Sequence, residues 1–479
     1  MNEENKNVIS QDAERTTFQE QPLIKITQRE IQEEIADERN ARNLRKRLLP
    51  RALLVGVVAG LIASAFRYSL HLLGEWRSGF LEQQAGGGVG TMWIPVLMVS
   101  LGAAISVWMV RTWSPASAGS GIPQLKGVLL HLRRMNWWSI LLVKFFGGLL
   151  AMGSGLALGR EGPMVQMGGA SGKMVGRMLG MTQAERYILI AAGAGAGLSA
   201  AFNAPLAGLI FVLEEISRAF TPVVFFAGLL ATVAADTVSR FMLGQDPVLR
   251  VELLDIPSLL VFPVFLVVGS VAGVLGVAFN RGLLGSLRLF DHTKSWPAWA
   301  VGLIVGLLVG SVGWFFPTLL GSGHGVTEQA LAGDLAIGAI VVFFVIRFFM
   351  TMVSYGCGAP GGIFAPVLVL GALLGLAVGL LAQKYYPVAI EQPQVFAVVA
   401  MAAFFTAVVR APLTAIILIL EMTNSYSLML PLLGACLTAY MVAEGMGDRP
   451  IYEVLMERDL KQQRARVKDE EREHLVQNS

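Results

Sequence analysis

The chain has 479 residues, of which 54% are hydrophobic and only 15% are charged, and its mean hydropathy is +0.61. Soluble globular proteins carry about 25% charged residues, so this composition excludes a water-soluble body and indicates a membrane protein. The net charge is only +3, and the basic residues form no stripe interleaved with aromatic residues, which argues against a nucleic-acid partner. Cys357 and Cys436 lie in apolar stretches and the five histidines show no metal-ligand spacing, so we expect no disulfide framework, metal site or cofactor.

The charged residues gather at the two ends of the chain, with 20 in residues 1–51 and 15 in residues 447–479. The N-terminal tail, residues 1–48, lacks the short apolar core of a signal peptide and ends in a basic cluster before the first apolar segment. An excess of Lys and Arg beside the first span predicts a cytoplasmic tail. Residues 26–47 also fit a solvated helix of alternating charge. At the other end of the chain, the charged pattern of residues 453–473 predicts a short cytoplasmic helix.

Long windows without charge follow one another through the body, residues 49–446. The main ones are 83–110, 187–213, 256–280, 295–327, 348–383 and 422–443. A membrane-spanning helix needs about 20 mainly apolar residues, so the body contains enough for roughly ten or more such helices. We therefore predict an all-α polytopic membrane protein.

Glycine and proline interrupt this body at three places. Gly119–Pro123 precedes a helix-like stretch, Gly162-Pro163 follows the apolar run 145–159, and Pro360–Gly362 lies inside the run 348–383. Backbone breaks at membrane depth are tolerated where they line a cavity or are buried in protein. The breaks therefore predict broken or re-entrant helices that meet at a site near the membrane midplane.

An internal repeat relates the two halves of the body. Pro163, Gly168, Gly172 and Gly176 match Pro366, Gly371, Gly375 and Gly379 at a constant offset of 203. Residues 203–214 resemble residues 410–421 at an offset of 207. Glycines every fourth residue can serve helix packing alone, but packing does not explain a shared offset. We predict two structural repeats, roughly 49–245 and 256–446, as in transporter cores.

Glu161 is the most informative single residue. An ionised carboxylate beside a helix break is costly to bury and marks a functional site by default. The simpler alternative is that Arg160 pairs with it.

Glu214 and Glu215 close another charge-free run. Adjacent helical residues point about 100° apart, so one can face the bundle interior while the other meets water. A helix end at the aqueous boundary and a proton-relay role are both open for this pair. Glu421, which matches Glu214, fits a structural role, because Met422 stands where a match to Glu215 would be.

The glycine-rich segments can hold an anion without a fixed positive charge. Free N–H groups at a helix start donate to anions. The amides of Ile363 and Phe364 follow Pro360–Gly362, and Ser120 adds a hydroxyl donor. Such partial charges suit a transported ion, which must bind and also leave.

Together these residues resemble the CLC family of chloride channels and transporters. The carrying segments are Gly119-Ser-Gly-Ile-Pro123, Gly159-Arg-Glu-Gly-Pro163 and Gly362-Ile-Phe-Ala-Pro366, in the family's order, with Tyr452 following near the end of the membrane body. The resemblance covers about residues 50–456. It implies a CLC-like inverted repeat around an anion site.

The resemblance also implies residue roles. Ser120 and Tyr452 would donate hydroxyls to a central chloride, completed by the amides of Ile363 and Phe364. Glu161 would be the external gate and proton acceptor, and Glu215 the internal proton-transfer residue of the exchanger branch.

The family further implies a homodimer with one pathway per subunit in a plasma or inner membrane, with both termini cytoplasmic. The C-terminal segment is too short for the paired CBS domains that many eukaryotic relatives append.

Two positions depart from the family pattern. Bacterial relatives tend to carry acidic residues where Gln124 and Lys126 stand, whereas Lys144 is present as usual. If Lys144 normally pairs with one of those acids, its partner must differ in this chain.

The sequence thus predicts a proton-coupled chloride antiporter in the lipid bilayer, which is not an enzyme. The alternative is a passive voltage- or pH-gated chloride channel, and Glu215 is the feature that discriminates the two. An intramembrane enzyme is a weaker reading, because Ser120 has no neighbouring His or Lys in the sequence.

Overall fold

The computed structural model describes residues 28–85, 89–218, 220–245, 248–249 and 259–477. The chain divides into two packed units, residues 1–47 and residues 48–479. In the first unit the described residues, 28–47, are helical, and all other described elements belong to the second.

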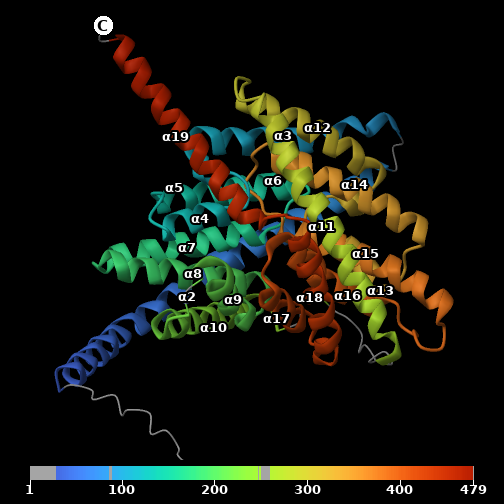
Figure 1. The fold of residues 1–479 in the computed structure, drawn as a ribbon. Helices are drawn as coiled ribbons and strands as arrows, with labels where there is room; N and C mark the ends of the chain where they lie inside the picture. Colours follow the sequence, from blue (N-terminus) through green and yellow to red (C-terminus); the bar gives the residue numbers. More distant parts are fainter. Residues whose placement is uncertain (1–27, 86–88, 219, 246–247, 250–258, 478–479) are drawn as a thin grey trace, which may run out of the picture. The chain divides into compact units, whose positions relative to one another are not determined.

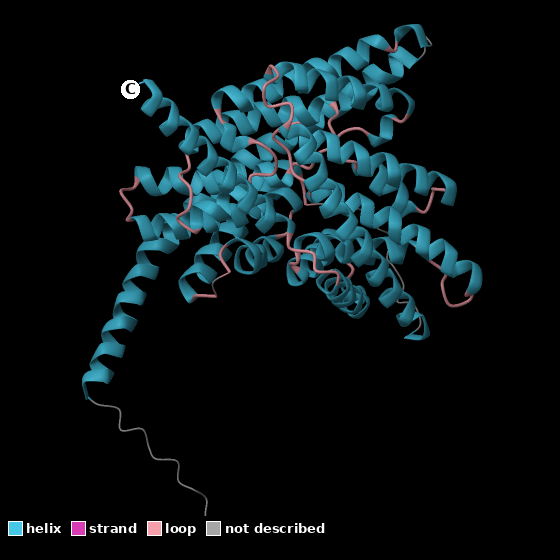
Figure 2. Ribbon diagram, turned by 45° about the horizontal axis from the view of Figure 1, so that its top comes forward, coloured by secondary structure: helices cyan, strands magenta, loops and turns pink. Residues whose placement is uncertain are grey.

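The described residues form helices and connecting loops and contain no strand, which confirms the predicted all-α fold (Figure 2). The α-helices are α2 (Gln28–Ala85), α3 (Trp93–Trp113), α4 (Ile122–Leu129), α5 (Trp137–Leu142), α6 (Gly148–Ser154), α7 (Glu161–Met178), α8 (Gln183–Phe202), α9 (Pro205–Phe211), α10 (Pro222–Leu243), α11 (Phe262–Asp291), α12 (Ala298–Phe315), α13 (His324–Ala332), α14 (Ile337–Gly356), α15 (Phe364–Tyr385), α16 (Gln394–Val409), α17 (Pro412–Thr423), α18 (Met429–Gly445) and α19 (Ile451–Gln477). Two π-helical segments, η4 (Val143–Gly147) and η5 (Val212–Ile216), continue α5 and α9. Short 3₁₀ turns are η2 (Val89–Thr91), η3 (Pro115–Ser117), η6 (Leu259–Val261), η7 (Pro317–Leu319) and η8 (Tyr426–Leu428).

Nine helical stretches among the described residues are long and apolar enough to cross a membrane. This is slightly fewer than the ten or more that the charge-free windows predict. The difference arises because several apolar segments are cut into helices shorter than the roughly 20 residues of a span. Gln394–Val409 and Pro412–Thr423 are two such short apolar helices.

The predicted helix breaks are present. α14 ends at Gly356 and α15 begins only at Phe364, while α6 ends at Ser154 and α7 begins at Glu161. Before α4, the backbone of Gly121 has a φ of 84°, which lies in the left-handed region that side chains disfavour. Glycine at this turn lets the chain reverse and start α4 beside Ser120.

The repeated glycines bring helix backbones together in both halves. A Cβ at Gly172 of α7 would collide with the backbone of Leu189 on α8. In the second half, a Cβ at Gly375 of α15 would collide with the backbone of Phe396 on α16. The glycines therefore do serve close packing, and they do so at matching places in the α7–α8 and α15–α16 pairs.

Matching residues of the two halves also contact each other directly. Gly159 and Gly362, which are 203 positions apart, form an antiparallel bridge in which each N–H donates to the other's carbonyl at 2.7 Å. Contacts in which equivalent residues exchange the same bonds are the mark of a two-fold axis. Because the bridge is antiparallel, the segments that match run in opposite directions, as in an inverted repeat.

A second reciprocal contact joins α9 and α17, which lie side by side (Figure 1). The Glu421 carboxylate accepts from the N–H groups of Leu206 and Ala207 at 3.0 and 2.8 Å. The Glu214 carboxylate accepts from those of Leu413 and Thr414 at 3.1 and 2.7 Å. Each half thus supplies the carboxylate that caps the first turn of the other half's short helix.

Candidate anion site and proton-transfer residues

Four helices begin around one region of the second unit. α4 packs against α7 and α19, and α15 packs against α7. α19 runs from its free C-terminal end to the neighbourhood of α4 (Figure 1). A helix start carries partial positive charge and unpaired N–H groups. The region therefore attracts negative charge.

Two hydroxyl groups are placed by these helix starts. Ser120 precedes α4 and Tyr452 lies in the first turn of α19, and both side chains are fully buried. The hydroxyls are neighbours, yet neither Ser120 Oγ nor Tyr452 Oη has a hydrogen-bond partner among the described residues. Buried polar groups are normally paired, so both hydroxyls are free to donate to a bound anion.

The Glu161 carboxylate is also buried here, at 2% exposure. Its Oε2 accepts from the N–H of Ala365, in the first turn of α15, at 3.3 Å. Its Oε1 lies 4.0 Å from Nε of Arg160. The ion pair with Arg160, which is the simpler explanation for Glu161, is therefore present but long. A carboxylate of one half therefore sits on the helix start of the other half, where an anion would sit.

Ile363 and Phe364 are the N-cap and the first residue of α15. At these positions N–H groups have no partner within their own helix. The Phe364 ring packs against Phe202, Phe211 and Phe405, with centroids 5.3, 6.5 and 4.3 Å away. This aromatic cluster fixes the start of α15 and keeps its surroundings dry.

The adjacent acids at 214 and 215 separate in the structure. Glu214 is partly exposed and caps α17, whereas Glu215 is only 1% exposed. Glu215 lies in the π-helical segment η5, and such segments are frequent at functional sites. Lys126 Nζ lies 2.7 Å from Glu215 Oε1 and is itself buried. Lys126, which stands where bacterial relatives tend to carry an acidic residue, is therefore the partner of Glu215.

Lys144 has different partners. Its buried ammonium donates to the carbonyls of Ser117 and Gly119 at 2.9 and 2.6 Å. Lys144 therefore holds the loop that ends at Ser120, through carbonyls rather than through an acid. Gln166 of α7 stabilises the same region, donating to the Ala116 carbonyl at 2.8 Å and to the Gln124 side chain.

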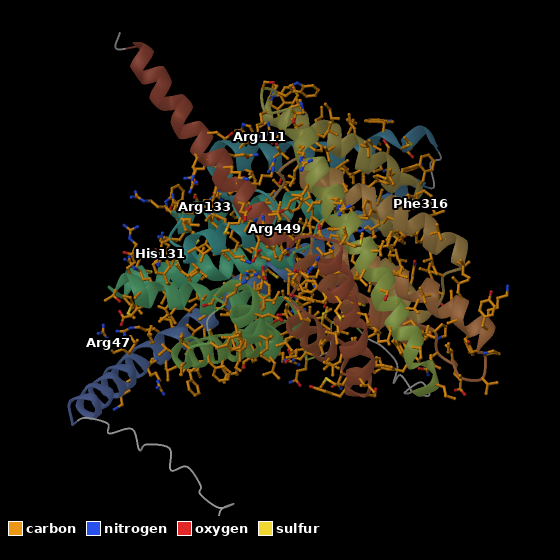
Figure 3. All side chains as sticks on the ribbon, in the orientation of Figure 1. Arg47, Arg111, His131, Arg133, Phe316 and Arg449 are labelled. Atoms are coloured by element: carbon orange, nitrogen blue, oxygen red, sulfur yellow. The ribbon has the colours of Figure 1, made fainter. Side chains whose placement is uncertain are left out.

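Two cavities are lined by residues of this region. The larger, about 1060 Å³, is lined by Gly119, Gly121 and Gln124 beside Ser120. Its charged lining residues are Arg111, Arg133, Arg134, Lys294 and Arg458 with Asp291 and Asp459. Figure 3 labels two of these cations, Arg111 and Arg133, close to α19. The excess of cations favours anion entry.

The smaller cavity, about 40 Å³, is lined by Glu161, Arg160, Ala365 and His324. Gly162 lies against Ser120, because a Cβ there would be 2.5 Å from Ser120 Oγ. Glu161 therefore lines the smaller cavity, and the next residue of the same helix, Gly162, contacts Ser120.

The structure brings together five of the six predicted residues around the helix starts. Glu215 lies near the first turn of α19, because Arg218 pairs with Glu215 at 3.8 Å and also with Glu453, the residue after Tyr452. Two contributing residues were not predicted. Ala365 supplies the amide that holds Glu161, and its signal was its place in the first turn after the Pro360–Gly362 break. Tyr355, whose hydroxyl accepts from the Ser120 N–H at 3.5 Å, has no distinguishing pattern in the sequence.

Comparison with known proteins shows a consistent set of relatives. Residues 102–444 match the family described as voltage gated chloride channel. The chain is 41% identical over 425 residues to the H(+)/Cl(-) exchange transporter ClcA of Vibrio cholerae serotype O1 (strain M66-2), covering 87% of this chain and 91% of the relative. It is 37% identical to ClcA of Yersinia pseudotuberculosis serotype IB (strain PB1/+), covering 90% and 92%.

Solved structures agree. A slow cyanobacterial Cl⁻/H⁺ antiporter superposes with a TM-score of 0.83 at 36% identity, covering 87% of this chain and 99% of that one. A CLC-type fluoride/proton antiporter superposes with a TM-score of 0.70 at 19% identity, covering 84% and 96%, and so shares the fold. The expected fold and family resemblance are thereby confirmed.

Proposed function

Because this chain belongs to the voltage-gated chloride channel family, we propose that it exchanges chloride for protons across a membrane. The observation that carries the proposal is the Glu161 carboxylate bound to the Ala365 amide beside two unpaired buried hydroxyls. A carboxylate and a chloride that need the same donors must occupy them in turn. Proton uptake by Glu161 then becomes coupled to anion binding.

Ser120, Tyr452 and the amides of Ile363 and Phe364 replace the hydration shell of one chloride. No fixed positive charge is needed, because helix starts and hydroxyls supply partial charges that allow the ion to leave. When Glu161 takes up a proton, it loses its attraction for the start of α15. The side chain then moves off and chloride enters its place.

Glu215 supplies protons from the opposite side. It is buried, titratable and close to the α19 turn that carries Tyr452. A passive channel needs no such group, so Glu215 favours exchange over the channel alternative.

The assembly and location follow the same proposal. The protein is a homodimer with one pathway per subunit, in a plasma or inner membrane, with both termini cytoplasmic. It performs transport and no covalent chemistry. The basic cluster before the first span supports the orientation.

The test is flux in liposomes that contain the purified protein. A chloride gradient should drive protons uphill in the wild type. Glu161→Gln should abolish proton movement and retain chloride flux, because the amide mimics the protonated gate. Glu391→Gln, an exposed carboxylate away from the site, is the control and should behave as wild type.

The wild type would be a channel if chloride moved and protons did not follow uphill. Proton transport that persists in Glu161→Gln would remove Glu161 from the mechanism.

A further inference from the structure

Four charged side chains of alternating sign form a string beside the proton-transfer residue. Lys126 on α4 pairs with Glu215 at 2.7 Å, and Arg218 Nη2 lies 3.8 Å from Glu215 Oε2. Arg218 in turn pairs with Glu453 on α19. The groups that face Glu215 are thus Lys126, Arg218 and Glu453, together with Tyr452.

The members of the string differ in their access to water. The Lys126 and Glu215 side chains are 5% and 1% exposed, whereas the Arg218 side chain is 50% exposed. Water screens the Arg218 charge, so its effect on Glu215 is small. The effect of Lys126 is large, because a buried pair at hydrogen-bond distance is little screened.

The pair also restricts the geometry of Glu215. Oε1 is occupied by Lys126, so Oε2 is the oxygen that remains for a proton. A buried carboxylate that lost Lys126 would be an uncompensated charge, which is costly. Without Lys126, the Glu215 carboxylate would therefore take up a proton at a lower proton concentration than it does beside Lys126.

We propose that Lys126 is a positioning residue for proton transfer, which favours the ionised form of Glu215, fixes the carboxylate through Oε1 and leaves Oε2 to exchange protons. The inference rests on the proposed antiport. Its consequence is that Glu215 takes up its proton at a lower pH than the same buried carboxylate would without Lys126, so that this pair helps to set the pH dependence of proton-coupled turnover.

The first experiment follows the protonation of Glu215 directly by infrared difference spectroscopy of the reconstituted protein. The carboxyl C=O band of protonated Glu215 is assigned by its loss in Glu215→Gln. Lys126→Met should move the pH at which this band appears upward by about one unit or more, since a nearby opposite charge changes a carboxyl's titration by that order. Lys126→Arg should restore the wild-type titration.

Two further variants test the reasoning from distance and burial. Arg218→Gln should move the band much less than Lys126→Met, because the Arg218 side chain is farther and half-exposed. Arg133→Gln removes a nearby cation that pairs with Asp459 rather than with Glu215, and should leave the band unchanged.

The same variants are then assayed for proton flux between pH 5 and 7.5. We expect the ratio of the Lys126→Met proton flux to the wild-type proton flux to be larger at pH 7.5 than at pH 5. A band that titrates alike in the wild type, Lys126→Met and Lys126→Arg would overturn the inference and leave antiport intact. A shifted band in a protein that moves no protons would support the effect of Lys126 on the protonation of Glu215, but it would overturn the antiport and with it the role in proton transfer.

Discussion

The hydroxyls of Ser120 and Tyr452 find no hydrogen-bond partner in the part of the chain that the structure describes. Ser120 Oγ and Tyr452 Oη come from segments more than 300 positions apart, yet both are buried beside the same helix starts. Burying an unpaired hydroxyl has a free-energy cost that folding alone does not repay. Donation to a chloride offsets that cost, and the ion is then held by groups that carry no net charge.

Removing either hydroxyl should therefore weaken chloride binding. A hydrogen bond to a charged group contributes about 1.5–3 kcal/mol, so Ser120→Ala and Tyr452→Phe should each lower chloride affinity by roughly tenfold or more. Isothermal titration calorimetry of the purified protein measures this. Ser171→Ala is the matched control, because the Ser171 hydroxyl is buried but donates to the Met167 carbonyl of its own helix. Equal affinities in Ser120→Ala and Ser171→Ala would contradict the assignment.

At the scale of elements, the short helices α9 and α17 are tied by the reciprocal Glu421 and Glu214 caps. Each carboxylate accepts two N–H groups from the other helix's first turn. Neutral helix caps contribute about 1 kcal/mol each. The two caps hold the first repeat against the second and so fix the position of the starts of α9 and α17 relative to each other.

Glu421→Gln should lower the midpoint of thermal unfolding in detergent, because the amide keeps one acceptor and loses the charge. Glu214→Gln should lower it by a similar amount, and the double variant should lower it further than either single variant, since the caps bind different helix starts. Glu75→Gln, an exposed carboxylate on α2, should leave the midpoint unchanged. Unaltered midpoints in both cap variants would show that the reciprocal bonds do not stabilise the fold.

At the scale of the whole molecule, one chain supplies every residue of the candidate pathway. Ser120, Glu161, Ala365 and Tyr452 all belong to the second unit of the same chain. In the homodimer proposed above, each subunit therefore carries its own set of these residues.

Linked dimers test this independence. A tandem of one wild-type copy and one Glu161→Gln copy should carry about half the proton flux of a wild-type tandem, because each pathway works alone. Chloride flux should remain through both copies. Proton flux close to zero, or equal to the wild-type tandem, would mean that the two pathways do not act independently.

The fold class of this protein and the places where its helices are interrupted can be predicted from the sequence. The charge-free windows and the glycine breaks predict the helical class and the interrupted helices, because both depend on neighbouring residues along the chain. The constant offset of 203 predicts the repeat, because it is a comparison of one half of the sequence with the other. Acids are rare enough in the membrane body that Glu161 stands out from the sequence alone, whereas Glu215 is separated from Glu214 only by the family resemblance.

The tertiary structure decides which groups meet. That Glu161 binds Ala365 of the other half, that Lys126 rather than Lys144 pairs with Glu215, and that Glu214 is a helix cap all depend on contacts between segments far apart in sequence. The sequence contains those residues but not their distances. A pairing across about 90 to 200 positions is set by how the two repeats pack, and the inverted packing decides which carboxylate is held by a lysine and which by a backbone amide.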